Sequence, residues 1–312
     1  MSINNEYKNI YNKEIIQKNK GIIISYPGTD EKYRYVPYSH GISEEAVEKL
    51  ADLMRKNLFF YAFGEEEIVD YYKKDFFNSM EQGAQYAYQK RSPKRADTKD
   101  GLLGEVLIDL LIQMYNPKAY KLSVRTIFRQ DDNTEIKGYD STYFSKDEHG
   151  ISLWLGQAKL GGKDYCKSGI NEDLVEKYLN NYLTTQLFFV CDKRISVTDD
   201  AKAILEMIEK INIKTMNADA DKRASELIKL FNDNEISIKI PCLLAYDKSD
   251  VYYSEQTLTE KVMNEVNSIK SYFDTQIYKF DGFKPEIVFY IFPIEDVSRL
   301  RNKETGFYAG LC

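Results

Sequence analysis

The chain has 312 residues, of which 43% are hydrophobic and 29% are charged, and its formal net charge is −6. This composition supports a sizeable core in one large or two small domains. No run approaches the roughly 20 apolar residues that cross a bilayer, and the N-terminus lacks a signal-peptide core, so we expect a cytoplasmic protein without a membrane segment.

Cysteine and histidine usage excludes several classes of site. The four cysteines are widely spaced and form no Cys-X-X-Cys pair, and His40 and His149 share no local motif. Zinc fingers and a disulfide framework are therefore not expected. The same spacing disfavours nuclease chemistry based on histidine.

Residues 1–89 are predicted to form a mainly helical region that serves as a scaffold or binds a partner. Within it, residues 33–38 alternate like an edge strand. Ser43 is a good helix N-cap, and two acidic residues follow it in the first turn. We expect helices from there through Leu58 and again over residues 65–89.

A cluster of basic residues follows this region. Nonspecific DNA affinity comes chiefly from cations that neutralise phosphates. A chain with negative net charge therefore needs either a local cluster of basic residues or a partner protein that supplies the positive charge. The local candidate could hold the DNA backbone across a scissile bond, and a solvated loop with Pro93 as helix breaker is equally compatible with the pattern. Its basic residues are Lys90, Arg91, Lys94, Arg95 and Lys99.

The segment 100–115 has the periodicity of a buried helix. Apolar residues stand at positions 102, 103, 106, 107, 110, 111 and 114, which is helical spacing. Glu105 flanks this apolar stripe, directly after Gly104. A Gly-Glu pair at such a border is commonly just solvated, so its meaning depends on the segments that follow.

Two strands around residues 146–150 are predicted to form a β-hairpin. Asp140 and Gln157 stand at nearly equal distances from its centre, so they should face each other across the antiparallel pair. Because strand side chains alternate between faces, Gln157 and Lys159 should point the same way and Ala158 the other way. One face of the hairpin then carries a carboxylate, an amide and an ammonium group.

These residue types suit hydrolysis of a phosphodiester. Mg²⁺ binds carboxylates, waters and phosphate oxygens, and Asp140 and Glu105 can supply two carboxylates. A bound cation would lower the pKa of a water and polarise a phosphoryl oxygen, while Lys159 could orient the water or offset charge on phosphorus. Each piece also has a structural interpretation, because Gly-Tyr-Asp suits a bulge and strand ends are often polar.

The C-terminal half alternates predicted helices and strands. Helices are expected over Glu172 to Leu187, Asp199 to Ile211 and Asp219 to Phe231. Two apolar strands, Ile236 to Ala245 and Glu286 to Phe292, are separated by a long helix. This series predicts an α/β protein with a mixed sheet flanked by helices.

The order of these motifs resembles the core of the PD-(D/E)XK nuclease superfamily, in which a helix Glu, a strand Asp and a (D/E)-X-K strand end surround the metal. The sequences at 104–105, 137–141 and 153–159 look more closely like the HamA family, the nuclease effector subunits of bacterial Hachiman anti-phage systems. The match covers about residues 100–162. The resemblance implies a PD-(D/E)XK-like domain over residues 90–312.

The resemblance also implies roles and partners. The catalytic set would be Glu105, Asp140, Gln157 and Lys159, with the first three at the metal, which would be Mg²⁺ with Mn²⁺ as a substitute. Gln157 stands where the superfamily usually has an acid, and Gln occurs there in some members. A HamB-like superfamily 2 helicase would deliver DNA and restrain the nuclease.

Three other functions stay open from the residues. One is a purely structural partner subunit, which would tolerate Asp140→Ala and Lys159→Ala in every assay except complex formation. The chain could be a catalytically weak nucleic-acid-binding subunit of a defence complex, which would lose affinity when the basic cluster is neutralised but would show no turnover. It could also be a stand-alone restriction-type endonuclease, which would cut specific sequences without a helicase.

Overall fold

One mixed β-sheet forms the centre of the protein. The computed structural model describes residues 3–91, 101–124, 138–148, 150–191 and 197–311. Within these residues the sheet has eight strands in the order β1-β3-β8-β7-β6-β5-β4, with β2 beside β3. The strands are β1 (Ile23–Ser25), β2 (Thr29–Asp30), β3 (Arg34–His40), β4 (Ala119–Lys121), β5 (Ser141–Asp147), β6 (Gly150–Gly161), β7 (Ile236–Asp247) and β8 (Glu286–Ile294).

The middle of the sheet is parallel and its ends are antiparallel. Strands β3, β8, β7 and β6 run parallel to one another, whereas β1, β2, β5 and β4 pair antiparallel. The sequences of β7 and β8 are almost continuously apolar because both faces of the parallel part are covered. The predicted α/β fold with a mixed sheet is confirmed.

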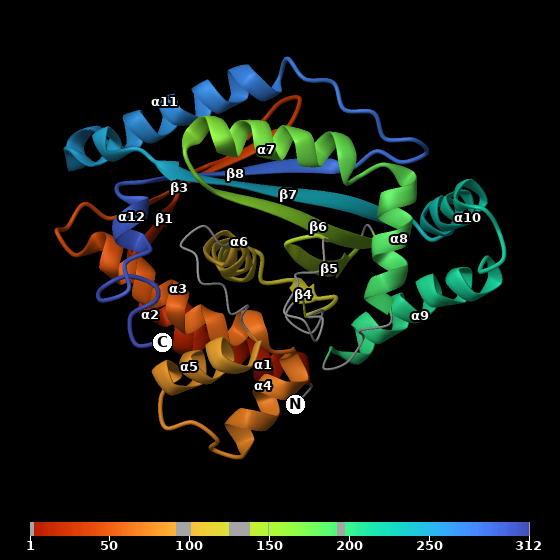
Figure 1. Ribbon diagram of the computed structural model, residues 1–312, viewed down its shortest axis with the longest axis horizontal. Coiled ribbons are helices and arrows are strands. Elements are labelled where there is room, and N and C mark those ends of the chain that lie inside the picture. Colours follow the sequence, from red (N-terminus) through yellow and green to blue (C-terminus); the bar gives the residue numbers. More distant parts are fainter. Residues whose placement is uncertain (1–2, 92–100, 125–137, 149, 192–196, 312) are drawn as a thin grey trace.

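Helices cover both faces of the sheet, and each layer has its own hydrophobic core (Figure 1). One layer combines the helical N-terminal region with the helix that carries Glu105. It consists of α1 (Ile3–Tyr11), a π-helical turn (Asn12–Ile16), α2 (Gln17–Asn19), α3 (Ala46–Ala62), α4 (Glu65–Lys73), α5 (Met80–Arg91), α6 (Leu102–Tyr115) and α12 (Val297–Leu300).

The opposite face packs against α7 and α11, with the remaining helices at its side (Figure 1). A short 3-10 turn, Ser249–Tyr252, precedes α11. None of the helices in the described part of the chain is both long and apolar enough to cross a membrane. The helices of this layer are α7 (Lys163–Glu176), α8 (Asn180–Cys191), α9 (Asp199–Lys214), α10 (Ala220–Asp233) and α11 (Glu255–Phe273).

Three local predictions are wrong. Strand β3 is not at the edge of the sheet, because it pairs with β8 on one side and with β1 and β2 on the other. The single helix expected over residues 65–89 is divided into α4 and α5, and Asp75 between them has a left-handed φ of 49° that no helix continues. The helix expected to start at Glu172 begins at Lys163 instead, ends at Glu176 and is followed by α8.

The first 89 residues contribute to the sheet as well as to the helical layer. Strand β3 lies parallel to β8, and α3 packs against α6. The division of the chain at residues 89 and 90 stays a prediction.

Candidate functional site

The predicted hairpin and its register are confirmed. Strands β5 and β6 pair antiparallel, with Ser141 opposite Gly156 and Asp147 opposite Gly150. Asp140 directly precedes β5, and its backbone N–H donates to the Gly156 carbonyl at 2.8 Å. Asp140 therefore lies opposite Gln157, as expected.

The carboxylate of Asp140 is fixed to the neighbouring strand. Its Oδ2 accepts a hydrogen bond of 2.8 Å from the backbone N–H of Ala158. The residue is 9% exposed. A buried carboxylate held by a backbone donor keeps a defined position at the end of the hairpin.

Side chains along β6 alternate between the two helical layers. On one face, a Cβ at Gly104 of α6 would lie 3.5 Å from the Ala158 Cβ, so this helix packs closely on Ala158. On the other face, a Cβ at Gly169 of α7 would lie 2.8 Å from Cε of Lys159. Glycine at both positions lets the helices approach β6, and the predicted alternation of Ala158 and Lys159 is confirmed.

Asp173 of α7 and Lys177, the C-cap of this helix, contact the predicted site. The Lys159 Nζ lies 2.7 Å from Oδ2 of Asp173, and the Lys177 Nζ lies 3.0 Å from the other carboxylate oxygen. Lys177 also donates to Oε1 of Gln157 at 2.7 Å. Gln157 is fully buried, and its Nε2 has no hydrogen-bond partner among the described residues.

Electrostatics keep Lys159 positively charged. Burial alone would lower the pKa of its ammonium group, but the hydrogen bond and charge of Asp173, with a contribution from Asp140, raise this pKa above its ordinary value. Lys159 therefore presents a cation to the site. The sequence analysis missed Asp173 and Lys177, although both follow Gly169 at intervals of four residues, which places them on one helical face.

Glu105 lies on α6, the helix that covers the Ala158 face of β6. It is 6% exposed, and its Oε2 accepts a short hydrogen bond from the Tyr61 hydroxyl of α3. The structure thus brings Asp140, Gln157 and Lys159 together at the end of the hairpin. Glu105 lies in the other helical layer, where the Tyr61 hydroxyl donates to its carboxylate.

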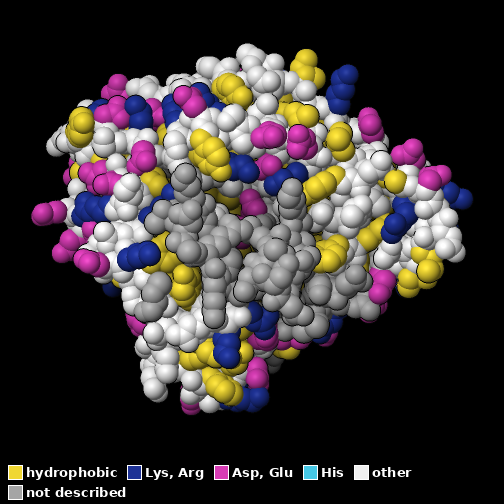
Figure 2. Space-filling view, in the orientation of Figure 1, with side chains coloured by type: hydrophobic (Ala, Val, Ile, Leu, Met, Phe, Trp, Pro, Cys, Tyr) yellow, Lys and Arg dark blue, Asp and Glu magenta, His cyan; other side chains and the backbone are white. Residues whose placement is uncertain are grey.

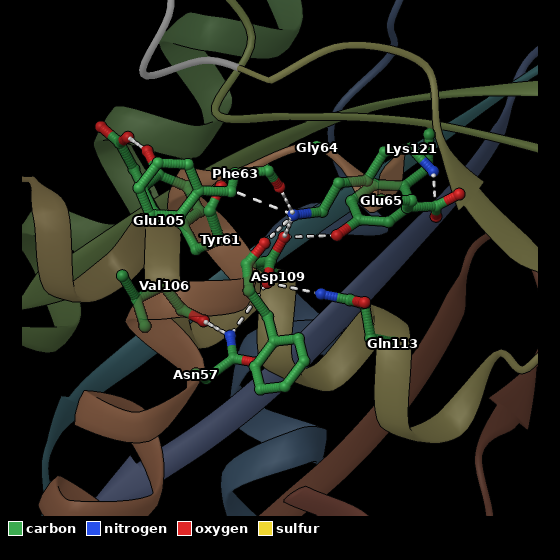
Figure 3. A network of polar contacts seen from close by, with 12 residues as sticks. Asn57, Tyr61, Phe63, Gly64, Glu65, Glu105, Val106, Asp109, Gln113 and Lys121 are labelled. Carbon is green, nitrogen blue, oxygen red and sulfur yellow. Dashed lines mark hydrogen bonds and ion pairs between the residues drawn. The ribbon is translucent and has the colours of Figure 1, made fainter. Parts of the chain in front are cut away.

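A buried polar network anchors α6 near this residue (Figure 3). Asp109, one helical turn after Glu105, accepts hydrogen bonds from Asn57 at 2.9 Å and from Gln113 at 2.8 Å. The Tyr143 hydroxyl of β5 donates to its other oxygen. These bonds connect α6 to α3 and to the hairpin strand.

Lys121 of β4 completes the network. Its Nζ lies 3.9 Å from Asp109 and donates to the backbone carbonyl of Phe63 at 3.2 Å. Its backbone N–H donates to Glu65 at 3.1 Å. Burial lowers the pKa of Lys121 despite the opposing effects of Asp109 and Glu65. Sequence reasoning missed this network, and its signal is the polar series Glu105, Asp109 and Gln113 in an apolar helix.

The predicted basic cluster is described only at its start. Lys90 is exposed at the end of α5, and Arg91 pairs with Glu67 at 3.1 Å. Lys94, Arg95 and Lys99 lie outside the described residues. On the face shown in Figure 2, the basic side chains of the described residues are interspersed with acidic ones.

The oxygen donors at this site have the chemistry that a hard divalent cation prefers. Glu105 and Asp140 are carboxylates, and Gln157 offers an amide oxygen, but Lys177 already binds that oxygen. Within the described part of the chain, no group of three or more His, Cys, Asp or Glu side chains is arranged to hold a metal. Carboxylate oxygens are the ligand type that such a cation prefers, whereas a cation at the Gln157 oxygen would compete with the Lys177 ammonium group.

The fold and the site define an α/β protein that carries buried carboxylates and lysines at the end of a β-hairpin in a mixed sheet. The chain matches no curated protein. It belongs to the HamA family, whose model matches residues 9–311, nearly the whole chain. The protein is therefore a component of a Hachiman defence system.

Proposed function

We propose that this protein is a Mg²⁺-dependent DNA nuclease and the effector of its defence system. The observation that carries the proposal is the meeting of Asp140, Gln157 and Lys159 at one end of the β5–β6 hairpin. The order α6, β4, β5, β6, α7 supports a PD-(D/E)XK-type core, because it is the order that the superfamily resemblance implies. Residues 90–312 would carry this core and residues 1–89 would support it.

The residues present divide the chemistry of hydrolysis among them. A divalent cation held by Glu105 and Asp140 would supply an activated water and polarise a phosphoryl oxygen. Asp140 is held in place by the Ala158 N–H, and Glu105 by the Tyr61 hydroxyl. Lys159, held by Asp173, presents its charge where negative charge develops on the phosphate.

Delivery of DNA is proposed to depend on a partner. The net charge of −6 opposes DNA binding by the isolated chain, and Arg91 is already paired with Glu67. Family membership supports a partner from the same system, and we propose a HamB-like superfamily 2 helicase. This helicase would bring DNA to the site and restrain cleavage until activation.

Cleavage of plasmid and linear DNA tests the proposal. The purified chain, alone and with the helicase, is incubated with Mg²⁺ or Mn²⁺ and compared with EDTA. Asp140→Asn and Lys159→Met should abolish metal-dependent cleavage. The matched control Asp164→Asn removes a carboxylate that is 94% exposed at the start of α7 and should retain cleavage.

The outcomes separate the alternatives. Cleavage that survives in both site variants refutes this assignment of the site. Equal cleavage without the helicase, at specific sequences, indicates a stand-alone restriction-type endonuclease. DNA binding without cleavage under any condition indicates a nucleic-acid-binding subunit.

A further inference from the structure

We propose that Lys177, held by Asp173, is the resident cation of this site and excludes a metal ion from the oxygen of Gln157. A metal is then bound through carboxylates alone until Lys177 moves away. This inference deepens the proposed nuclease function and rests on it. It assigns a role to a lysine that lies 20 residues beyond Gln157 in the sequence.

One face of α7 is shaped for this purpose. Gly169, Asp173 and Lys177 follow one another at four-residue intervals, so they form one row along the helix. Gly169 makes room for the aliphatic part of Lys159, and the Asp173 carboxylate then contacts both lysines, at 2.7 Å and 3.0 Å. The row therefore positions two ammonium groups, of Lys159 and Lys177, beside the hairpin end.

The contact with Gln157 is direct. The Lys177 Nζ lies 2.7 Å from Oε1, which is hydrogen-bond distance, so the ammonium group occupies one of the two lone pairs of this oxygen. A second cation at that oxygen would also stand beside the ammonium charge, and the repulsion is strong in a buried site. Since Gln157 is fully buried, water screens this repulsion poorly.

The amide of Gln157 adds no negative charge to the site. A carboxylate at position 157 would have favoured a divalent cation, whereas an amide contributes no charge. Asp173 supplies one negative charge for two ammonium groups, Lys159 and Lys177. Removal of the Lys177 charge should therefore release the amide oxygen and favour metal binding.

Calorimetric titration with Mn²⁺ alone, without DNA, tests the inference. We expect Lys177→Met to bind Mn²⁺ about tenfold more tightly than the unaltered chain. Lys177→Arg keeps the charge and should retain the original affinity. Lys167→Met is the matched control, because Lys167 lies on the same helix and pairs with the exposed Asp164.

A double-mutant cycle identifies the oxygen involved. Gln157→Met removes the amide oxygen at similar size and should change the Mn²⁺ affinity less than twofold while Lys177 is present. In the Lys177→Met background, Gln157→Met should abolish the roughly tenfold increase in Mn²⁺ affinity. Lys177 is 23% exposed at the end of α7, and thermal melts verify that the variants are folded.

Three results would overturn the inference. They are an unchanged affinity in Lys177→Met, no Mn²⁺ binding in either chain, or a gain that persists without the Gln157 oxygen. The nuclease proposal fails separately, in the cleavage assay. Metal-dependent cleavage with unchanged affinity in Lys177→Met refutes only this inference, and tighter binding with no cleavage under any condition refutes only the nuclease.

Discussion

Acid should destabilise this protein through His40, a fully buried residue at the end of β3. The imidazole stacks on Tyr252 with ring centroids 4.0 Å apart. Its Nδ1 lies 2.7 Å from the Gly41 carbonyl and therefore donates, while Nε2 accepts from the Glu295 N–H at 3.0 Å. The neutral ring satisfies both bonds, and a proton on Nε2 would break the second one.

The size of the effect follows from the pKa. Burial lowers the pKa of His40 from 6.5 to about 4. The unfolded chain therefore takes up the proton first as pH falls, and stability that is fully present above pH 6.5 is lost toward pH 4. The difference amounts to about 3 kcal/mol in the free energy of unfolding.

Urea denaturation at pH 7 and pH 4 measures this loss. Because carboxylates also titrate in this range, the informative quantity is the difference between the unaltered chain and His40→Gln. The unaltered chain should lose about 3 kcal/mol more than the variant. Equal losses in the unaltered chain and His40→Gln would refute the reasoning.

Two further substitutions test the framework of the site. Gly156→Ala places a Cβ 2.1 Å from the Ser141 Oγ and 3.0 Å from Pro241 Cγ, so it should lower the free energy of unfolding by about 1–3 kcal/mol in chemical denaturation. Gly162→Ala is the control, because a Cβ there has no atom within 4 Å. Equal stabilities of the two variants would contradict the expectation. Asp109→Ala removes the carboxylate paired with the buried Lys121 and should cost about 3–5 kcal/mol in the free energy of unfolding. A loss below about 1 kcal/mol would show that the network does not anchor α6.

The hairpin could be predicted because its information is local. A polar turn, alternating strands and the equal distances of Asp140 and Gln157 from the turn determine which residues face each other. The apolar periodicity of α6 likewise predicts a buried helix, although the structure buries it on all sides, Glu105 included, where the pattern placed Glu105 at the border of an apolar stripe. Those signals depend on residues within one or two elements.

The remaining site depends on contacts between distant segments. Asp173 and Lys177 gain their role from β6, and Gly169 weakens the helical signal of the segment that carries them. Asp109 stands in an apolar helix, but its partners Tyr143 and Lys121 come from separate strands. No pattern within the helix itself identifies such partners.

The two sides of the site differ in how far they can move. On the α6 side, Asp109 and Lys121 are almost fully buried, and a shift of the helix would separate charges that water cannot reach. Glu105 is therefore held rigidly relative to β5. On the α7 side, Lys177 is 23% exposed at a helix end, so its ammonium group can leave the Gln157 oxygen and bind water instead. Any rearrangement that opens the oxygen of Gln157 should then occur at α7, while the carboxylate side keeps its geometry.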